Sequence, residues 1–492
     1  MIKQQVEQNE KLTPLTDLLP DCVREVMERL DHLGEQTILQ GNAAQAIVRD
    51  APPRHMKGSC LITTAPPATI EKELKKLGKG TLVKKPDSRV FRLEGLPSIH
   101  PSVSEPVSIR IESLRKRTPP TPWFSELRLK GLERDLATRE ITVRAFGIQR
   151  TGALVDPFGG AEDAKAGALR SVVPNKRAFK ENGLWALKMA RHIGETGLDP
   201  QDNVYRHARV HAGRILDVPV GLWRPHLNRL LLSDHVEKGL DFLLESGTLR
   251  FICPEVVSMV DFHLSCPVHH KDLWDHTKKV IAQAEKNLTV RWAALMHDIG
   301  KVWTRSVTHD RKVHFFRHEE FGALLFRGVA GRLELTPEFT DAVDYVIKNH
   351  SRVNLYDSNW TDSAVRRLIK ECGEFLPELI CFSKADFTTK RQSKVRELKR
   401  QLQELETRIE RIREDDAKPR PLPKGLGNLL MKRFEIPPGK ELGELRAWLI
   451  EEVENGNVPR QADPEIYMDY LLKHAERIET AGGSIRSASS IS

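Results

Sequence analysis

The stretch at residues 292–301 could do chemistry, because an apolar run ends there in a histidine beside an aspartate, WAALMHDIGK. Imidazole and carboxylate groups are ligands of hydrolytic divalent metals, and burying them near apolar residues costs free energy unless a metal or hydrogen bonds compensate. Neighbouring helical residues point about 100° apart, so His297 and Asp298 alone cannot enclose an ion. The pattern predicts a metal site whose other ligands come from elsewhere in the chain.

Further candidate ligands occur on both sides of this stretch, each near apolar sequence of helical spacing. The metal ligands that we expect are His276, His297, Asp298 and Asp386. His318 and His350 are expected to hold a second ion, bind a phosphate or act as a general acid, because imidazole can donate a proton to a leaving alkoxide near neutral pH. The alternative for these two is a capped surface histidine or a hydrogen-bonded core histidine.

The ligand types indicate metal-assisted hydrolysis of a phosphate ester. A bound divalent ion lowers the pKa of its water toward 7 and neutralises charge on phosphate oxygens. Lys301 is placed to meet such an oxygen, unless it is an ordinary surface lysine at a helix end. Because no thiolate is among the ligands, we expect one or two ions of Mn²⁺, Ni²⁺, Co²⁺ or Mg²⁺, with Zn²⁺ also compatible.

Length and composition bound the rest of the chain. Its 492 residues exceed a single hydrophobic core, so roughly two to four domains are expected. Lys and Arg number 77 against 68 Asp and Glu, an excess that favours a polyanionic partner such as RNA. The six cysteines have no metal-binding spacing, and no apolar run is long enough for a bilayer. We therefore expect a cytoplasmic protein with no membrane partner.

Two motifs follow a region whose pattern alternates short strands and helices. Strands are predicted at 37–40, 60–64, 81–83, 90–93 and 107–111, with a turn at Gly41. The later segments DLATREITVRA, from Asp135, and DPFGGAED, from Asp156, resemble motifs of the class II tRNA nucleotidyltransferases and bacterial poly(A) polymerases. The order His, His-Asp, His, His, Asp resembles the HD phosphohydrolase superfamily.

The resemblance implies an α+β protein in four parts. Residues 1–150 would form a small mixed α/β nucleotidyltransferase-type head, and 151–270 an all-α neck and body. Residues 271–390 would form an HD helical domain, followed at 391–480 by a helix and a helical tail. Within the neck, helical spacing predicts helices at 178–193, 202–216 and 222–236.

The head departs from the family's pattern where metal-binding acids are needed. Nucleotidyl transfer requires two or three carboxylates holding two Mg²⁺ ions about 3.5–4 Å apart. One register places the family's Asp-x-Asp on Ser59 and Leu61, and the other places it on His55 and Lys57. The third acid falls on Arg110. We therefore predict that the head does not polymerise.

A head without acids would be a retained RNA-binding scaffold, a structural remnant or, against this prediction, a surviving polymerase. A phosphate could bind where Lys57, Arg110 and Arg144 replace metal and nucleotide. Arg139 and Arg144 are the candidate nucleotide- or RNA-binding residues of this part.

The C-terminal part has two features. Apolar residues from 395 to 412 recur at spacings of three and four, which predicts a helix that packs within the chain or pairs with a second copy. Residues 425–445 resemble the tail of the same family, so Lys432, Arg433 and Lys440 are expected to contact an RNA backbone. The alternative is a helical cap with solvated lysines.

The function that these observations favour is a metal-dependent HD-type phosphohydrolase acting on RNA 3′ ends or nucleotides. Its substrates would be 2′,3′-cyclic phosphates and 2′- or 3′-phosphates, which some relatives of this architecture hydrolyse, and its inactive head would recognise RNA. The partner would be RNA, either tRNA or RNA 3′ ends. The alternatives are a tRNA CCA-adding nucleotidyltransferase or poly(A) polymerase, and a non-catalytic RNA-binding protein.

Overall fold

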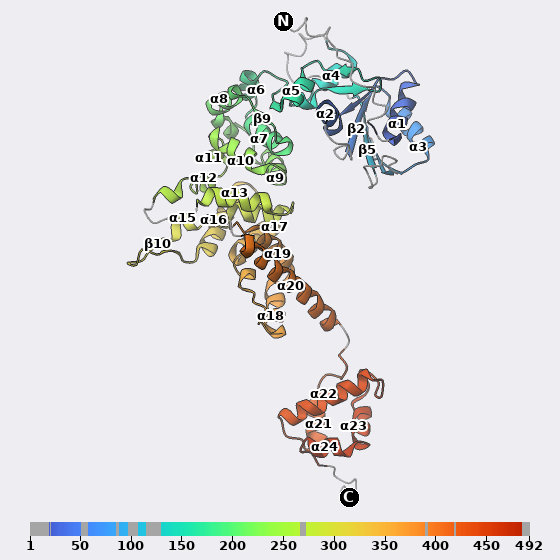
Figure 1. Cartoon of the computed structure of the whole chain (residues 1–492), viewed down its shortest axis with the longest axis vertical. Coiled ribbons are helices and arrows are strands. Elements are labelled where there is room, and N and C mark those ends of the chain that lie inside the picture. Colours follow the sequence, from blue (N-terminus) through green and yellow to red (C-terminus); the bar gives the residue numbers. More distant parts are fainter. Residues whose placement is uncertain are drawn as a thin grey trace. The chain divides into compact units, whose positions relative to one another are not determined.

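The protein is described from a computed structural model that covers residues 19, 21–50, 58–84, 88–96, 107–114, 129–265, 272–388, 392–417 and 420–484. The chain forms two compact units (Figure 1). The first comprises Met1–Leu355 and Glu374–Gln392, and the second Tyr356–Gly373 and Ser393–Ser492. Among the described residues, no helix combines the length and apolarity that crossing a membrane requires.

The head is built on a mixed sheet of seven strands in the order β3-β4-β5-β2-β1-β6-β7. Within it β2 and β5 run parallel, and the other neighbours are antiparallel. The expected α+β class is confirmed. The strands are β1 Thr37–Gln40, β2 Gly58–Thr63, β3 Thr81–Lys84, β4 Val90–Leu96, β5 Val107–Ser113, β6 Gly147–Gln149 and β7 Leu154–Val155.

Alternation along β5 shows how this sheet separates its two faces. Ile109 and Ile111 are completely buried, whereas Arg110 points its guanidinium to the opposite face, where it pairs with Glu112. Helices α1, α2 and α3 lie between or before the first strands in the sequence, α4 lies between β5 and β6, and α5 follows β7. Their bounds are α1 Asp21–Asp31, α2 Asn42–Val48, α3 Pro67–Leu77, α4 Gly131–Leu136 and α5 Gly160–Ala166.

The DPFGG motif forms the start of α5. The two carboxylate oxygens of Asp156 accept hydrogen bonds of 2.8 Å each from the backbone N–H groups of Gly160 and Ala161. A Cβ at position 160 would lie 2.0 Å from the carbonyl oxygen of Thr142, so glycine is required there by close packing. The motif therefore fixes α5 against the preceding segment.

The neck is largely helical, with departures from the expected pattern: the helix expected at 202–216 ends at Val210, and the one expected at 222–236 ends at Leu231. The helix predicted at 178–193 is broken between α6 and α7, where a Cβ on Gly183 would lie 2.2 Å from the carbonyl oxygen of Arg214. Two short strands, β8 and β9, pair in parallel, so this part is not wholly helical. The elements are α6 Asn175–Glu181, α7 Trp185–Thr196, β8 Ala168–Leu169, β9 Asp199–Pro200, α8 Asp202–Val210, α9 Arg224–Leu231, α10 Val236–Glu245, α11 Leu249–Ile252 and α12 Pro254–Val257.

The next helices pack around α14, whose residues from Val290 to Met296 are all buried. A helix buried on every side belongs in a core, and here the ring of Trp292 on α14 packs against that of Phe326. The elements of this part are α13 Leu273–Gln283, α14 Leu288–Met296, α15 Lys301–Thr304, β10 Arg305–Val307, β11 Val313–Phe315, α16 His318–Arg332, α17 Pro337–Asn349 and α19 Leu376–Ala385.

The second unit contains the predicted long helix, α20. Its apolar seam, including Leu402, Leu405 and Ile409, is buried within the chain, and Arg408 Nε donates to Asp362 Oδ1 at 2.8 Å. The seam thus packs in cis. The helices are α18 Asp362–Cys372, α20 Gln392–Ala417, α21 Leu426–Phe434, α22 Lys440–Glu454, α23 Pro464–Leu472 and α24 Ala475–Thr480. The division into four parts at the expected boundaries stays a prediction.

Candidate metal centre

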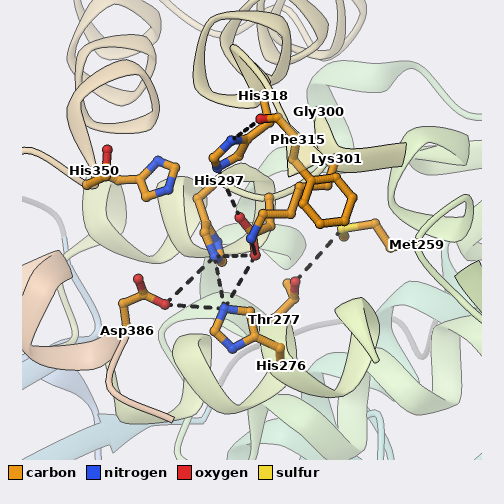
Figure 2. A network of polar contacts seen from close by, with 12 residues as sticks. Met259, His276, Thr277, His297, Gly300, Lys301, Phe315, His318, His350 and Asp386 are labelled. Atoms are coloured by element: carbon orange, nitrogen blue, oxygen red, sulfur yellow. Dashed lines mark hydrogen bonds and ion pairs between the residues drawn. The ribbon is translucent and has the colours of Figure 1, made fainter. Parts of the chain in front are cut away.

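The predicted metal ligands lie at the ends of five helices that face one point. His276 is in the first turn of α13, and His318 begins α16. The other ligands directly follow helices: His297 and Asp298 follow α14, His350 follows α17 and Asp386 follows α19. Figure 2 shows the side chains of His276, His297 and Asp386 converging. Chain ends of packed helices thus gather residues that are up to 110 positions apart in sequence.

The first group of ligand atoms has the spacing of a coordination shell. His276 Nε2 lies 3.3 Å from His297 Nε2, 3.4 Å from Asp298 Oδ2 and 3.2 Å from Asp386 Oδ1. An ion bound at about 2.0–2.2 Å separates neighbouring ligand atoms by roughly 3.0–3.5 Å. His276, His297 and Asp298 therefore have the spacing to hold one divalent ion, and Asp386 lies beside them, with its Oδ1 4.0 Å from His297 Nε2.

Backbone carbonyls fix the orientation of three of the imidazoles. Nδ1 of His297 donates to the carbonyl of Ala294 at 3.0 Å, since a carbonyl can only accept. The same arrangement holds Nδ1 of His318 and of His350, on the carbonyls of Phe315 and Ile347. With Nδ1 held in this way, each ring directs its Nε2 toward the site, which is how proteins orient metal-binding histidines.

A second group of potential ligands shares Asp298 with the first. Asp298, His318 and His350 offer ligand atoms that all lie within 4.8 Å of one another, as do His276, His297 and Asp298. Asp298 Oδ2 faces the first group, whereas its Oδ1 is buried without a hydrogen-bond partner and lies 3.6 Å from His318 Nε2. A buried, unsatisfied carboxylate oxygen is costly, so a cation here would relieve a real deficit. The carboxylate is thus placed to bridge two ions.

Charge in the centre is consistent with this division of ligands. Burial would raise the pKa of Asp298, but His297 and Lys301 hold it well below its usual value. Burial, followed by the charge of His297, lowers the pKa of His350 to about 4, and burial with Lys301 lowers that of His318. His318 and His350 are therefore neutral near pH 7, the form in which imidazole binds a metal.

Lys301 occupies the edge of the centre. Its Nζ lies 2.7 Å from Asp298 Oδ2 and 5.7 Å from the centre of the Phe315 ring. In the structure this ammonium pairs with the carboxylate of Asp298. Its contact with a phosphate oxygen stays a prediction. The structure also shows a supporting residue that the sequence argument missed: Thr388 Oγ1 lies 2.9 Å from His276 Nδ1.

The head contains a second cluster of charged residues, around β2 and β5. Ser59 and Leu61 are completely buried, so the acids of the family motif cannot be sought there. The accessible face is the alternate one, where Cys60 on β2 lies opposite Arg110 on β5. His55 and Lys57 lie outside the described residues.

Two buried carboxylates stand on this accessible face. Glu112 pairs with Arg110, and Arg139 Nη2 lies 3.8 Å from Glu112 and 2.9 Å from Asp135. Glu112 and Asp135 are only 8% and 7% exposed. Burial and then the charge of Glu112 raise the pKa of Cys60 to about 11, which places this carboxylate next to the thiol. Arg139 therefore lies between the carboxylates of Glu112 and Asp135 and pairs with Asp135.

Arg144 belongs to a different group of charges, between the head and α7. Its Nη2 lies 2.9 Å from Glu195, and its carbonyl accepts a hydrogen bond from the Gln40 amide. Nearby, the carboxylate of Glu140 forms an ion pair with Arg191 and lies 2.7 Å from Nε2 of His192. The tail residues Lys432, Arg433 and Lys440 are exposed and belong to the other unit.

Lowering the pH is expected to destabilise the protein through His192. Burial lowers the pKa of His192 from 6.5 to about 4. Between these two pKa values His192 is protonated in the unfolded chain but neutral in the folded one. The free energy of unfolding therefore falls as the pH falls from about 6.5 to 4, by roughly 3 kcal/mol for this group. Denaturant unfolding at several pH values should show a flatter pH dependence for His192→Gln than for wild type. If the free energy of unfolding of His192→Gln depended on pH as steeply as that of wild type, His192 would have to be protonated in the folded state.

The comparisons with known proteins agree with this geometry. The HD domain family model matches residues 272–389. The A-adding tRNA nucleotidyltransferase of Deinococcus radiodurans is 29% identical over 350 residues, which cover 68% of this chain and 78% of that protein. A match of this length extends far outside the HD segment. The chain carries an HD domain and is homologous to the tRNA nucleotidyltransferases.

Other relatives give the same result for this tRNA nucleotidyltransferase homologue. The multifunctional CCA protein of Chromobacterium violaceum is 32% identical over 249 residues, which cover 49% of this chain and 59% of that protein. The fold resembles that of the Bacillus stearothermophilus CCA-adding enzyme, with a TM-score of 0.51 at 15% identity, over 93% of this chain and 98% of that one. The resemblance to the class II family is therefore confirmed.

These relationships overturn two of the functional predictions. The hypothesis of a dedicated phosphohydrolase with an inactive head is wrong, because the relatives are tRNA nucleotidyltransferases and CCA proteins. The prediction that nucleotidyltransferase activity is improbable is wrong for the same reason. It rested on two registers that found no acid, at Ser59 and Leu61 or at His55 and Lys57, and on Arg110 in place of the third acid. The structure buries Ser59 and Leu61. The HD domain remains.

Proposed function

We propose that this protein is a tRNA nucleotidyltransferase that adds nucleotides at the 3′ end of tRNA. The observation that carries the proposal is the 350-residue match to the A-adding tRNA nucleotidyltransferase, which is far longer than the HD domain alone. The partner is then tRNA. A second function is not needed to account for the matched length.

The carboxylates proposed for this reaction are Glu112 and Asp135. They are the buried acids on the accessible face of β2 and β5, and each is held by an arginine. When bound there, divalent ions supply activation of the attacking hydroxyl and neutralise the triphosphate. Glu112 and Asp135 would hold those ions, and Arg110 and Arg139, released from their carboxylates, would be free to contact phosphate oxygens.

The HD centre is proposed as a separate site for divalent metal. His276, His297, Asp298 and Asp386 would hold one ion, and Asp298, His318 and His350 a second. Nitrogen and carboxylate ligands without thiolate suit Mn²⁺, Ni²⁺ or Co²⁺, and Mg²⁺ where more oxygen ligands are supplied by water. Lys301 would pass from Asp298 to a phosphate oxygen when an ion takes over the carboxylate.

Replacing Asp135 by Asn is expected to abolish nucleotide addition, with a loss of roughly 100-fold or more, because one ion ligand and its charge are removed. The measurement is incorporation of labelled ATP and CTP into tRNA transcripts that lack their 3′-terminal nucleotides, with Mg²⁺ or Mn²⁺. Glu94→Gln, which changes an exposed carboxylate on β4 of the same sheet, is the matched control and should keep full activity. Wild-type protein that binds tRNA but incorporates no nucleotide would refute the proposed function.

A further inference from the structure

In the sequence, a β-hairpin lies between Lys301 and His318 of the metal centre. It consists of β10 and β11, antiparallel, with Ser306 opposite His314 (Figure 1). Lys301, which contacts Asp298, precedes the hairpin, and His318 follows it. The base of the hairpin therefore joins the HD centre, through Lys301 at its start and His318 at its end.

The two faces of this hairpin differ in what they contact. On one face, Arg305 stacks 4.4 Å from the centre of the Phe262 ring and donates to Ser265 Oγ at 2.8 Å. Phe315, its partner across the strands, contacts Lys301. Because side chains alternate along a strand, His314 belongs to the other face. One face thus packs on the protein, and the opposite face is available.

The available face carries a stack of two rings. His314 and Phe316 lie with their planes 7° apart and their centres 5.1 Å apart. Phe316 is 68% exposed, which is unusual for so large an apolar side chain. Trp303 and Val307, both about half exposed, lie in the same segment. A parallel pair of rings that ends at an open ring is a platform on which another planar group can stack.

The same segment has a charge suited to a polyanion. Among residues 301–317 there are five basic residues and a single acidic one, Asp310. Arg311 and Lys312 are exposed at the tip of the hairpin, and Arg317 is exposed at its base. The basic residues are Lys301, Arg305, Arg311, Lys312 and Arg317. Cations beside exposed rings are the combination by which proteins bind unpaired nucleotides.

We propose that the β10–β11 hairpin binds an unpaired stretch of RNA. A base stacks on the open face of Phe316, which His314 backs, and Arg311 and Lys312 contact phosphates. The bound strand then runs alongside the metal centre, where Lys301 and His318 stand. The choice of RNA rests on the proposed action on tRNA. A second copy of the chain or an anionic lipid surface would also accept apolar and basic side chains, but neither would require a flat stack of rings.

The test is fluorescence anisotropy of a labelled oligoadenylate of about 12 nucleotides with the full-length protein. Phe316→Leu, which keeps an apolar side chain but removes the ring, should weaken binding at least tenfold, whereas Phe316→Tyr should bind as wild type does. The double variant Arg311→Gln/Lys312→Gln should reduce the slope of log K against log salt by about 1.4, as expected for two contacts to a single strand. Leu324→Ala, at an exposed position on α16, is the control and should change neither.

Equal binding by wild type and Phe316→Leu would overturn the proposal, as would equal affinity for duplex RNA of the same sequence. Sedimentation would overturn it in favour of self-association if Phe316→Leu dissolved a dimer while oligonucleotide binding stayed the same. Co-sedimentation with vesicles of anionic phospholipid that depended on Phe316, with no effect on RNA, would favour a lipid surface. The proposed function is tested separately, because nucleotide incorporation can fail while Phe316-dependent RNA binding persists.

Discussion

Substituting Asp298 by Ala is expected to remove metal from the HD centre altogether, with the affinity for divalent ions falling by more than about 100-fold. Replacing even a residue that only supports a ligand costs roughly 10–100-fold in metal affinity, and Asp298 is the proposed ligand that both groups share. Its Oδ2 faces His276 and its Oδ1 faces His318. Metal content after dialysis, and titration calorimetry with Mn²⁺, would measure the loss.

The matched control is Asp386→Ala. Asp386 joins only the first group, where its Oδ1 lies 3.2 Å from His276, so the group of Asp298, His318 and His350 is left complete. This variant should therefore lose one ion where the chain binds two, or bind a single ion more weakly. Equal metal content in Asp298→Ala and wild type would contradict the assignment of Asp298 as the shared ligand.

Substituting Gly300 by Ala is expected to destabilise the protein by roughly 1–3 kcal/mol, because a methyl group must be forced into a close-packed contact. A Cβ at this position would lie 2.1 Å from the carbonyl oxygen of His318 and 2.7 Å from the backbone nitrogen of Gly322. The first turn of α16 would have to move, and His318 with it. Denaturant unfolding would measure the destabilisation, and metal titration should show the second group weakened more than the first.

Gly328, on the same helix α16, provides the control. A Cβ there would meet nothing within 4 Å, so Gly328→Ala should stabilise the protein by about 0.5–1 kcal/mol through the lower entropy of the unfolded chain. If Gly300→Ala were as stable as Gly328→Ala, the turn after His297 and Asp298 would not be packed against α16.

Much of the metal centre could be predicted from the sequence, because its ligands occur at helix ends. Periodicity locates a helix and therefore its ends, and a histidine or aspartate just beyond an apolar helix is conspicuous. His297 and Asp298 follow α14 in this way, as His350 follows α17. What periodicity cannot supply is the contact of one helix end with another. The support of His276 by Thr388 and the bridging position of Asp298 appear only in the structure.

The head could be predicted as a fold but not as a site. A shift of one residue along a strand moves every side chain to the other face. Counting residues from a distant motif can be wrong by one, and it therefore cannot decide which side chains of a strand are exposed. The count that selected Ser59 and Leu61 selected the buried face of β2. Asp135 was quoted as part of a motif but not singled out as a candidate acid, because α4 brings it near β5 only in three dimensions.

Nucleotide incorporation into tRNA lacking its 3′ end, measured side by side for Asp135→Asn and Asp298→Ala, tests most directly whether the head and the HD centre are separate sites. If the head adds nucleotides and the HD centre holds its own metal, Asp135→Asn loses incorporation and keeps the HD metal, whereas Asp298→Ala loses that metal and keeps incorporation. Incorporation that survives in Asp135→Asn, or that is lost in Asp298→Ala while the protein stays folded, would contradict this division.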